Sequence, residues 1–318
     1  MREIMKKIYI ILLILFIILI SLVGVSILLV ISLSGENIDL FGGEKIAKVY
    51  LCNEIYFDYN QDDSLFPETK KDARYYINLL DKLEKDDSVK GVLLIVNSPG
   101  GEVIASEKLA RKVEELAKKK PVVVYVEGLD ASGAYMVSAP ADYIVAEKHS
   151  IVGSIGVRMD LIHYYGLMKK LGINVTTIKA GKYKDIGSPF RPMTKEEKEY
   201  LQKMINETYM DFVKWVAEHR HLSINYTLKI ADGKIYTGED AKKVGLVDEV
   251  GTEETALKKL EELANVSNPE IVEYGLEENR GLFGLDYIAY YLGYGIGKGI
   301  GEVLYGMEKI NGRVELLS

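Results

Sequence analysis

The first part of the chain is a long apolar run, whereas the remainder alternates between short apolar runs and amphipathic segments. No charged residue occurs between positions 8 and 33. As a helix this run would be about 39 Å long, which exceeds the roughly 30 Å hydrocarbon core of a bilayer. Basic residues outnumber acidic ones ahead of it, so the positive-inside rule predicts a single-pass anchor at 8–33. Residues 1–7 would then lie in the cytoplasm and the rest outside. A cleaved signal peptide is the alternative, although its apolar region is usually only about 7–15 residues.

After a polar linker at residues 34–44, the hydrophobic pattern indicates a soluble domain at 45–266. Strands are predicted at residues 45–55, 91–96, 121–126, 142–146 and 175–179. Helices are predicted at residues 70–84, 104–117, 161–171, 194–218 and 253–264, with shorter ones after Ser132 and near Gly238. This alternation of apolar strands with helices predicts an α/β fold with a mostly parallel sheet covered by helices.

The remaining segment, residues 267–318, is predicted to be a C-terminal tail. Its stretch at 283–307 is rich in tyrosine and glycine, and Gly293, Gly297 and Gly301 recur at every fourth position. Small residues at this spacing allow close helix contact. Charged residues within the stretch argue against a second membrane span, so we expect a segment that contacts the oligomer or the membrane surface.

Composition narrows the classes of function. The chain has 318 residues, a formal net charge of −7, one cysteine and four histidines. The acidic balance argues against a nucleic-acid partner, because phosphate binding needs a concentrated basic surface. A single cysteine excludes an intrachain disulfide. The histidines have no metal-ligand spacing, and neither a metal nor another cofactor is expected.

Two glycine-marked turns could carry the chemistry of an amide hydrolase. Such an enzyme needs a nucleophile, a base and backbone N–H groups directed at the developing oxyanion. The Asn-Ser-Pro-Gly-Gly stretch at 97–101 follows a buried strand, and Gly101 there could supply one N–H group. Ser132 also follows a buried strand and starts a predicted helix, so the N–H of Gly133 could join that of Gly101. The alternatives are a tight turn at 97–101 and a helix N-cap at Ser132.

The general base is harder to choose from the residues alone. No histidine has a motif around it, but a glycine-bounded loop at 181–189 carries Lys182 and Lys184. A lysine acts as a base only when neutral, which requires burial beside the nucleophile. The sequence does not rank the two lysines, and it leaves open that both are solvated.

Several of these segments together resemble the signal peptide peptidase A family, the Ser-Lys peptidases of the Clp/crotonase-like fold with its repeated ββα spiral. The resemblance covers residues 45–263 and rests on the motifs at 96–101, 131–135, 153–157, 181–185 and 236–248. It implies that Ser132 is the nucleophile and Lys184 the base. It also implies that Ser154 holds the lysine amine, and that Gly101 and Gly133 form the oxyanion hole.

The resemblance carries further expectations for the whole protein. The chain looks like the short, single-domain form, which implies a homo-oligomer, expected to be an octamer, with serine and lysine contributed by neighbouring subunits. Its substrates would be cleaved signal peptides or other hydrophobic peptides at the cell membrane, and no cofactor would be needed. The alternatives are a membrane serine protease of the stomatin-associated type, a crotonase-type acyl-CoA enzyme and an inactive scaffold. The spacing between Ser132 and Lys184 and the single apolar span favour the first reading.

Overall fold

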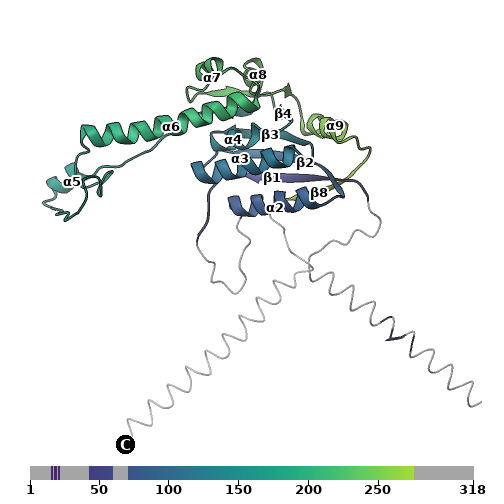
Figure 1. The fold of residues 1–318 in the computed structure, drawn as a ribbon, viewed down its shortest axis with the longest axis horizontal. Helices are drawn as coiled ribbons and strands as arrows, with labels where there is room; N and C mark the ends of the chain where they lie inside the picture. Colours follow the sequence, from purple (N-terminus) through teal and green to yellow (C-terminus); the bar gives the residue numbers. More distant parts are fainter. Residues whose placement is uncertain (1–15, 17, 20, 22–42, 60–70, 276–318) are drawn as a thin grey trace, which may run out of the picture. The chain divides into compact units, whose positions relative to one another are not determined.

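The apolar β-branched runs of the sequence form strands that lie side by side in one sheet (Figure 1). This computed structural model describes residues 16, 18, 19, 21, 43–59 and 71–275, and all statements below concern those residues. The strands are β1 (Lys45–Cys52), β2 (Val89–Ser98), β3 (Val122–Ala131), β4 (Tyr143–Ala146), β5 (Ile151–Gly153), β6 (Ile235–Thr237), β7 (Glu249–Val250) and β8 (Glu270–Tyr274). The helices are α2 (Ala73–Lys85), α3 (Val103–Ala117), α4 (Gly133–Ser138), α5 (Tyr165–Lys170), α6 (Lys195–His219), α7 (Ile224–Ile230), α8 (Gly238–Lys243) and α9 (Glu253–Ala264).

The sheet is mostly parallel. Its strand order is β6-β5-β3-β2-β1-β8, and β4 pairs with both β3 and β7. The pairs are parallel except for β5 with β6, which is antiparallel. Parallel neighbours need crossover connections, and here helices supply most of them. The predicted mixed α/β fold with a mostly parallel sheet is therefore confirmed.

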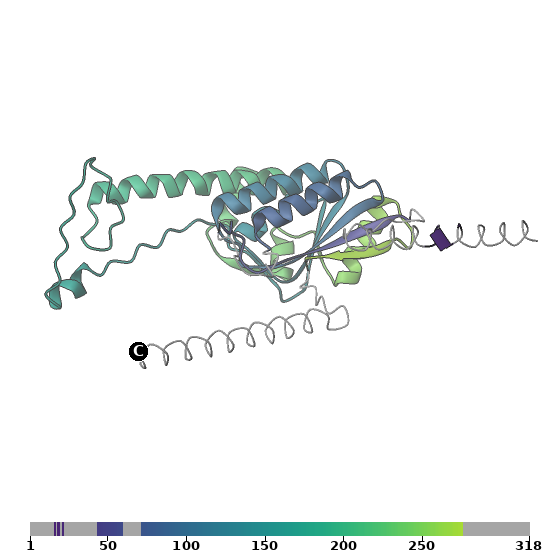
Figure 2. The same ribbon diagram turned by 90° about the horizontal axis from the view of Figure 1, so that it is seen from below.

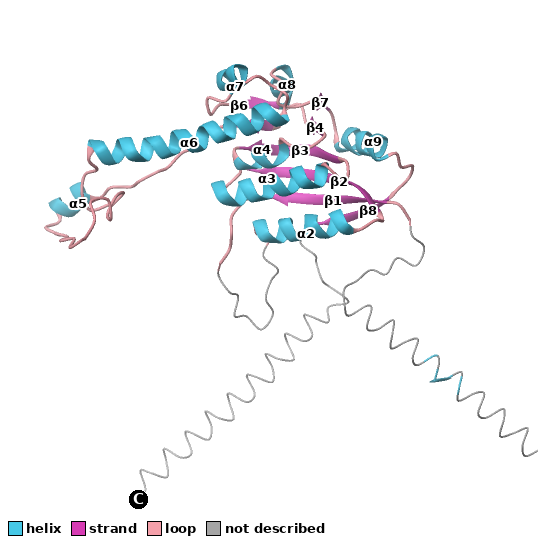
Figure 3. Cartoon of the chain, viewed as in Figure 1, coloured by secondary structure: helices cyan, strands magenta, loops and turns pink. Residues whose placement is uncertain are grey.

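Helices cover both faces of this sheet (Figure 3). Successive side chains of a strand point to opposite faces. In β2, Val92, Leu94 and Val96 join the larger core cluster, to which α2, α3 and α4 also contribute. The intervening Leu93 and Ile95 pack in the second cluster, which contains apolar residues of α9. Burial on both faces explains why this strand is a continuous apolar run in the sequence.

A long projection extends from the sheet along α6. We call residues 159–204 the arm, and Figures 1 and 2 both place α5 and the start of α6 away from the strands. The predicted start of α6 is confirmed, because Thr194 and Glu197 form a capping box. The strand predicted at 175–179 is wrong, since those residues pair with no strand and Ile178 is 97% exposed. A β-branched run needs a neighbouring strand, and the arm holds none in the described part of the chain.

Two predicted segments fall largely outside the described residues. The anchor at 8–33 is described at only four of its positions, and the tail is described only up to residue 275. Among the residues that the structure describes, no helix has the length and apolar character to span a bilayer. The sheet itself continues past residue 266, because β8 pairs in parallel with β1.

Candidate active site

Ser132 lies on a sharp turn between β3 and α4. Its backbone angles are φ 55° and ψ −123°, a left-handed conformation that is unfavourable for any residue with a side chain. Such strain costs about 1–3 kcal/mol and persists only where the surrounding structure enforces it. The turn is fixed because the Ser132 N–H donates to the Gly153 carbonyl at 2.8 Å. Ser132 occupies the N-cap position of α4, as the alternative interpretation expected, but its hydroxyl makes no capping hydrogen bond to the helix.

Two backbone N–H groups beside Ser132 have no acceptor in the described part of the chain and are available to an incoming oxygen. Gly133 is the first residue of α4, where no carbonyl within the helix can accept its N–H. The Gly101 N–H takes no part in the pairing with Ile55. The Ile55 N–H donates to the Gly100 carbonyl, and the Glu102 N–H donates to the Ile55 carbonyl. The two groups lie close together, since a Cβ built on Gly133 would be only 3.2 Å from the Gly101 nitrogen.

Both glycines are required by close contacts as well as by backbone chemistry. A Cβ on Gly101 would lie 1.9 Å from the Ile55 carbonyl oxygen. A Cβ on Gly133 would lie 2.2 Å from the Ser106 Oγ. Real Cβ atoms do not approach other atoms this closely, so a side chain at either position would displace the N–H groups.

Ser154 shares a cavity with the serine and both glycines. The β3–β5 register pairs Ala131 with Gly153, which places Ser132 and Ser154 one residue beyond the same pair. The cavity has a volume of about 840 Å³. Its wall is lined by Glu54, Pro99, Gly100, Gly101, Val103, Ser106, Ser132, Gly133, Met136, Ser154, Ile155, Gly156, Val157, Arg158, Thr208, Tyr209, Phe212, Ala231, Asp232 and Gly233. The wall combines glycine and apolar residues with the charged residues Glu54, Arg158 and Asp232.

The lysine loop is elsewhere in the same chain. Lys182 donates to both carboxylate oxygens of Glu196 at 2.5 and 2.6 Å, which ties the loop to the first turn of α6. The first residue of α6 that lines the serine cavity is Thr208, 13 positions after Lys195. At 1.5 Å per residue these positions are about 20 Å apart. The structure therefore does not bring Ser132 and Lys184 together within one chain.

Lys184 differs from the neighbouring lysines in its ion pairs. Lys179 pairs with Asp185, and Lys182 pairs with Glu196. The backbone N–H of Lys184 donates to the Gly181 carbonyl at 3.3 Å, but its side chain is exposed and its amine forms no hydrogen bond or ion pair with any other described residue. Its amine is the one in this loop that remains available to a partner outside the described part of the chain.

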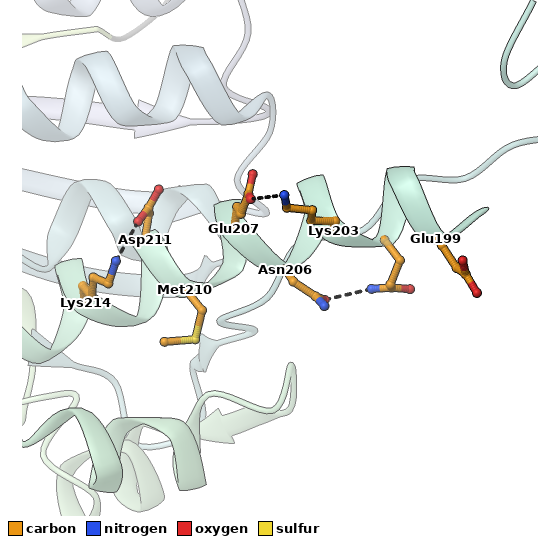
Figure 4. A pocket seen from close by; sticks show the side chains of 8 residues that line it. Glu199, Lys203, Asn206, Glu207, Met210, Asp211 and Lys214 are labelled. Atoms are coloured by element: carbon orange, nitrogen blue, oxygen red, sulfur yellow. Dashed lines mark hydrogen bonds and ion pairs between the residues drawn. The ribbon is translucent and has the colours of Figure 1, made fainter. Parts of the chain in front are cut away.

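A second concavity, on α6, has no comparable chemistry (Figure 4). All eight lining residues belong to that helix, and most of its polar groups are already paired. Lys203 pairs with Glu207, and Lys214 pairs with Asp211. The described residues also contain no group of three or more histidine, cysteine or carboxylate side chains that could hold a metal ion.

Sequence reasoning missed one ionisable group directly behind the nucleophile. Asp130 is fully buried two residues before Ser132, and burial raises the pKa of its carboxyl to about 7, which the nearby Ser138 hydroxyl opposes only in part. The signal in the sequence was a carboxylate between two apolar residues, Leu129 and Ala131, at the end of β3. Asp130 lies in β3, paired with Ser98 and Val152, so its charge state affects the stability of the strand that leads into the turn.

Comparisons with known proteins agree with this arrangement. The sequence profile of peptidase family S49 matches residues 114–267, and that of Clp protease matches residues 64–149. A protein of Methanocaldococcus jannaschii described as a "putative protease" is 93% identical over 99% of this chain and all of that protein. A "putative signal peptide peptidase SppA" of Enterococcus faecium is 36% identical over 73% of this chain and 67% of that protein. Protease 4 of Haemophilus influenzae is 38% identical over 59% of this chain and 30% of that protein.

A solved structure is a weaker match. The 1510-N membrane-bound stomatin-specific protease has a TM-score of 0.47 and 14% identity, covering 74% of this chain and 99% of that one. This similarity is too low to bear on function.

A serine on an enforced strand-to-helix turn beside two free amides is the arrangement of a serine hydrolase. The chain belongs to the signal peptide peptidase A family of S49 peptidases and is a serine peptidase.

Proposed function

We propose that the protein is an endopeptidase in which Ser132 of one subunit and Lys184 of a neighbouring subunit form one active site. The observation that carries this proposal is the separation within a single chain. Ser132 lies in a cavity beside two backbone amides, whereas Lys184, whose amine has no partner among the described residues, lies in a loop held about 20 Å along α6. The Ser132 cavity lacks a base, and the Lys184 loop lacks a nucleophile.

In this mechanism the neutral Lys184 amine accepts the proton of the Ser132 hydroxyl. The Ser132 Oγ forms a bond to the substrate carbonyl carbon, and the resulting oxyanion accepts hydrogen bonds from Gly101 and Gly133. The lysine then donates its proton to the leaving amine, and the peptide C–N bond breaks. Water activated by the same lysine hydrolyses the acyl-enzyme. Ser154, which lines the cavity, holds the incoming lysine amine.

The arm is the means by which one subunit reaches the next. Several of its apolar side chains are strongly exposed, among them Ile162 at 72%, Leu171 at 64% and Ile178 at 97%. Contiguous exposed apolar surface is typical of a protein interface. We propose that a second copy of the chain covers this surface in a closed homo-oligomer, for which the family resemblance suggests eight subunits.

The substrates proposed are cleaved signal peptides, with other hydrophobic membrane peptides as the wider class. The apolar side chains of the cavity wall, Val103, Met136 and Phe212, favour small or apolar side chains next to the cleaved bond. The uncharged run at 8–33 would anchor the protein and hold the peptidase domain at the outer membrane surface, where such peptides are released.

The test is cleavage of a synthetic signal peptide by the purified full-length protein in lipid vesicles. Ser132→Ala and Lys184→Ala should each lower kcat by about a thousandfold or more, because each removes a reacting group. Lys182→Ala is the matched control and should retain most activity. Loss of activity in Lys182→Ala with retention in Lys184→Ala would show that the base is assigned wrongly. Retention in both Ser132→Ala and Lys184→Ala would refute the mechanism.

The substrate class is tested separately with two peptides of equal length. The enzyme should cleave a peptide with an apolar signal-peptide core much faster than one in which that core is replaced by polar residues. Equal rates for the two peptides would contradict the proposed substrate class while leaving the chemical mechanism intact.

A further inference from the structure

The loop that carries Lys184 is fastened to α6 by one arginine. The Arg191 guanidinium donates from Nε to Oδ2 of Asp185 and from Nη2 to Oδ1 of Asp185, both at 2.8 Å. It also donates from Nη1 and Nη2 to the two carboxylate oxygens of Glu197, at 2.9 and 2.6 Å. Planar, forked contacts of this kind fix orientation as well as distance. We call Arg191, Asp185 and Glu197 the clasp.

The clasp joins two positions that matter for the site. Asp185 is the residue directly after Lys184, and Glu197 is in the first turn of α6. Glu197 is itself held, because it accepts from the Thr194 N–H at 2.9 Å in the capping box. The Glu197 and Asp185 side chains are only 5% and 13% exposed, although the surrounding arm is largely open to solvent. A loop that would otherwise be mobile is thus attached to a rigid helix end.

The clasp also determines which cations the Asp185 carboxylate binds. Both of its oxygens bind Arg191, and Lys179 pairs with it as well, which holds the pKa of that carboxyl well below its usual range. Arg191 and the Thr194 amide lower the pKa of Glu197 to about 2. The remaining charged groups of the loop also bind one another, because Lys182 and Tyr183 both donate to Glu196. The Lys184 amine pairs with no carboxylate among the described residues.

We propose that Arg191 is a positioning residue for the base: it fixes the loop at the end of α6 and keeps the Asp185 carboxylate from pairing with the Lys184 amine. The inference rests on the proposed role of Lys184. A lysine base must lose its proton, and an adjacent free carboxylate would favour the protonated form. By binding that carboxylate, Arg191 allows Lys184 to enter the neighbouring cavity without a counter-ion.

The test is the pH profile of kcat/KM for signal-peptide cleavage by the full-length protein, from pH 6 to 10. Arg191→Ala should lower kcat/KM at neutral pH by about tenfold or more and move the acid limb of the profile upward by roughly one pH unit, because it frees Asp185 Oδ2 beside the base while Lys179 keeps only Oδ1. In the double variant Arg191→Ala with Asp185→Asn, the acid limb of the pH profile should return to its wild-type position, whereas kcat/KM should stay reduced. Lys195→Ala, which removes a nearby cation in the first turn of α6, should match the wild type, since its ion pair with Glu199 is exposed.

Each outcome bears on the inference. A lower rate in Arg191→Ala with an unmoved limb would reduce Arg191 to a structural residue and overturn the proposal, as would an unchanged profile. If Arg191→Ala does not assemble, Arg191→Lys takes its place, because a single ammonium cannot hold both oxygens and should give a smaller shift of the same sign. Ser132→Ala and Lys184→Ala run in parallel. If they remain active, the proposed function fails, whereas inactivity with a normal Arg191→Ala profile means that only the clasp inference fails.

Discussion

The Ser132 turn and the Lys184 loop are built in opposite ways. The turn lies between a buried strand and a buried helix, and packing enforces its unfavourable backbone. The lysine loop is exposed and is positioned by ion pairs and hydrogen bonds with the start of α6. A nucleophile benefits from a rigid setting that holds the oxyanion donors in place. A base that enters another subunit needs to be accessible before assembly.

The comparison predicts that changes of one methyl group have large effects at the turn. Gly133→Ala should lower kcat by about a hundredfold to a thousandfold, the effect of losing one oxyanion donor, because its Cβ would displace the turn from Ser106. Gly156→Ala is the matched control in the same cavity, since the nearest atom to its Cβ would be 3.5 Å away. Cleavage rates of the two variants measure the difference. Equal activity in both would show that the turn is not rigid.

The two regions should also respond to pH with opposite signs. The folded-state pKa of Asp130, about 7, is raised above its ordinary value of 3.8, so the folded state holds this proton more tightly than the unfolded state. The free energy of unfolding should therefore fall as pH rises from about 4 to about 7, losing about 3 kcal/mol between pH 5 and pH 8. Glu197, with its pKa lowered to about 2, contributes stability above its ordinary pKa that is lost only as the pH falls toward 2.

Denaturant unfolding of the wild type and Asp130→Asn at pH 5 and pH 8 checks this prediction. The variant should remove most of the difference between the two pH values. A wild-type protein that is equally stable at both would show that Asp130 is not a buried, protonated acid.

The strain at the turn predicts a smaller effect on stability. Ser132→Gly and Ser132→Ala should both be inactive, but the glycine variant should be more stable by about 1 kcal/mol, because glycine adopts the left-handed conformation without steric cost. Denaturation midpoints of the two variants give the comparison. A more stable alanine variant would mean that the turn is not strained.

We expect the smallest effect on the free energy of unfolding in the arm. Lys184→Ala should change the free energy of unfolding by less than about 0.5 kcal/mol, because its side chain is exposed and has no partner in the described part of the chain. Lys112→Ala is the contrasting variant and should cost about 3 kcal/mol, since the Lys112 side chain is 8% exposed and its ammonium binds Asp81 and Glu84. A comparable loss in both variants would contradict the exposed, unpaired state of Lys184.

The same contrast explains what the sequence could predict. The buried strands and the long helices were predicted to within a few residues, except at the C-terminal end of β3, because hydrophobic periodicity reports burial directly. Short strands such as β5 and β6 were not, since three residues carry no periodicity and their pairing partners decide them. The convergence of Gly101, Gly133 and Ser154 on Ser132 was anticipated from motifs. The distance of Lys184 from that cavity depends on how far α6 carries the loop, which no local pattern reports.

The central claim is that one active site needs two copies of the chain, and mixing inactive variants tests it most directly. Ser132→Ala retains a functional lysine and Lys184→Ala retains a functional serine, so subunits of the two are combined in equal amounts under conditions that allow exchange. The account predicts that the mixture regains about a quarter of the wild-type cleavage rate, because in a closed ring a quarter of the interfaces join an intact serine to an intact lysine. A mixture that exchanges subunits and stays inactive would contradict the shared site.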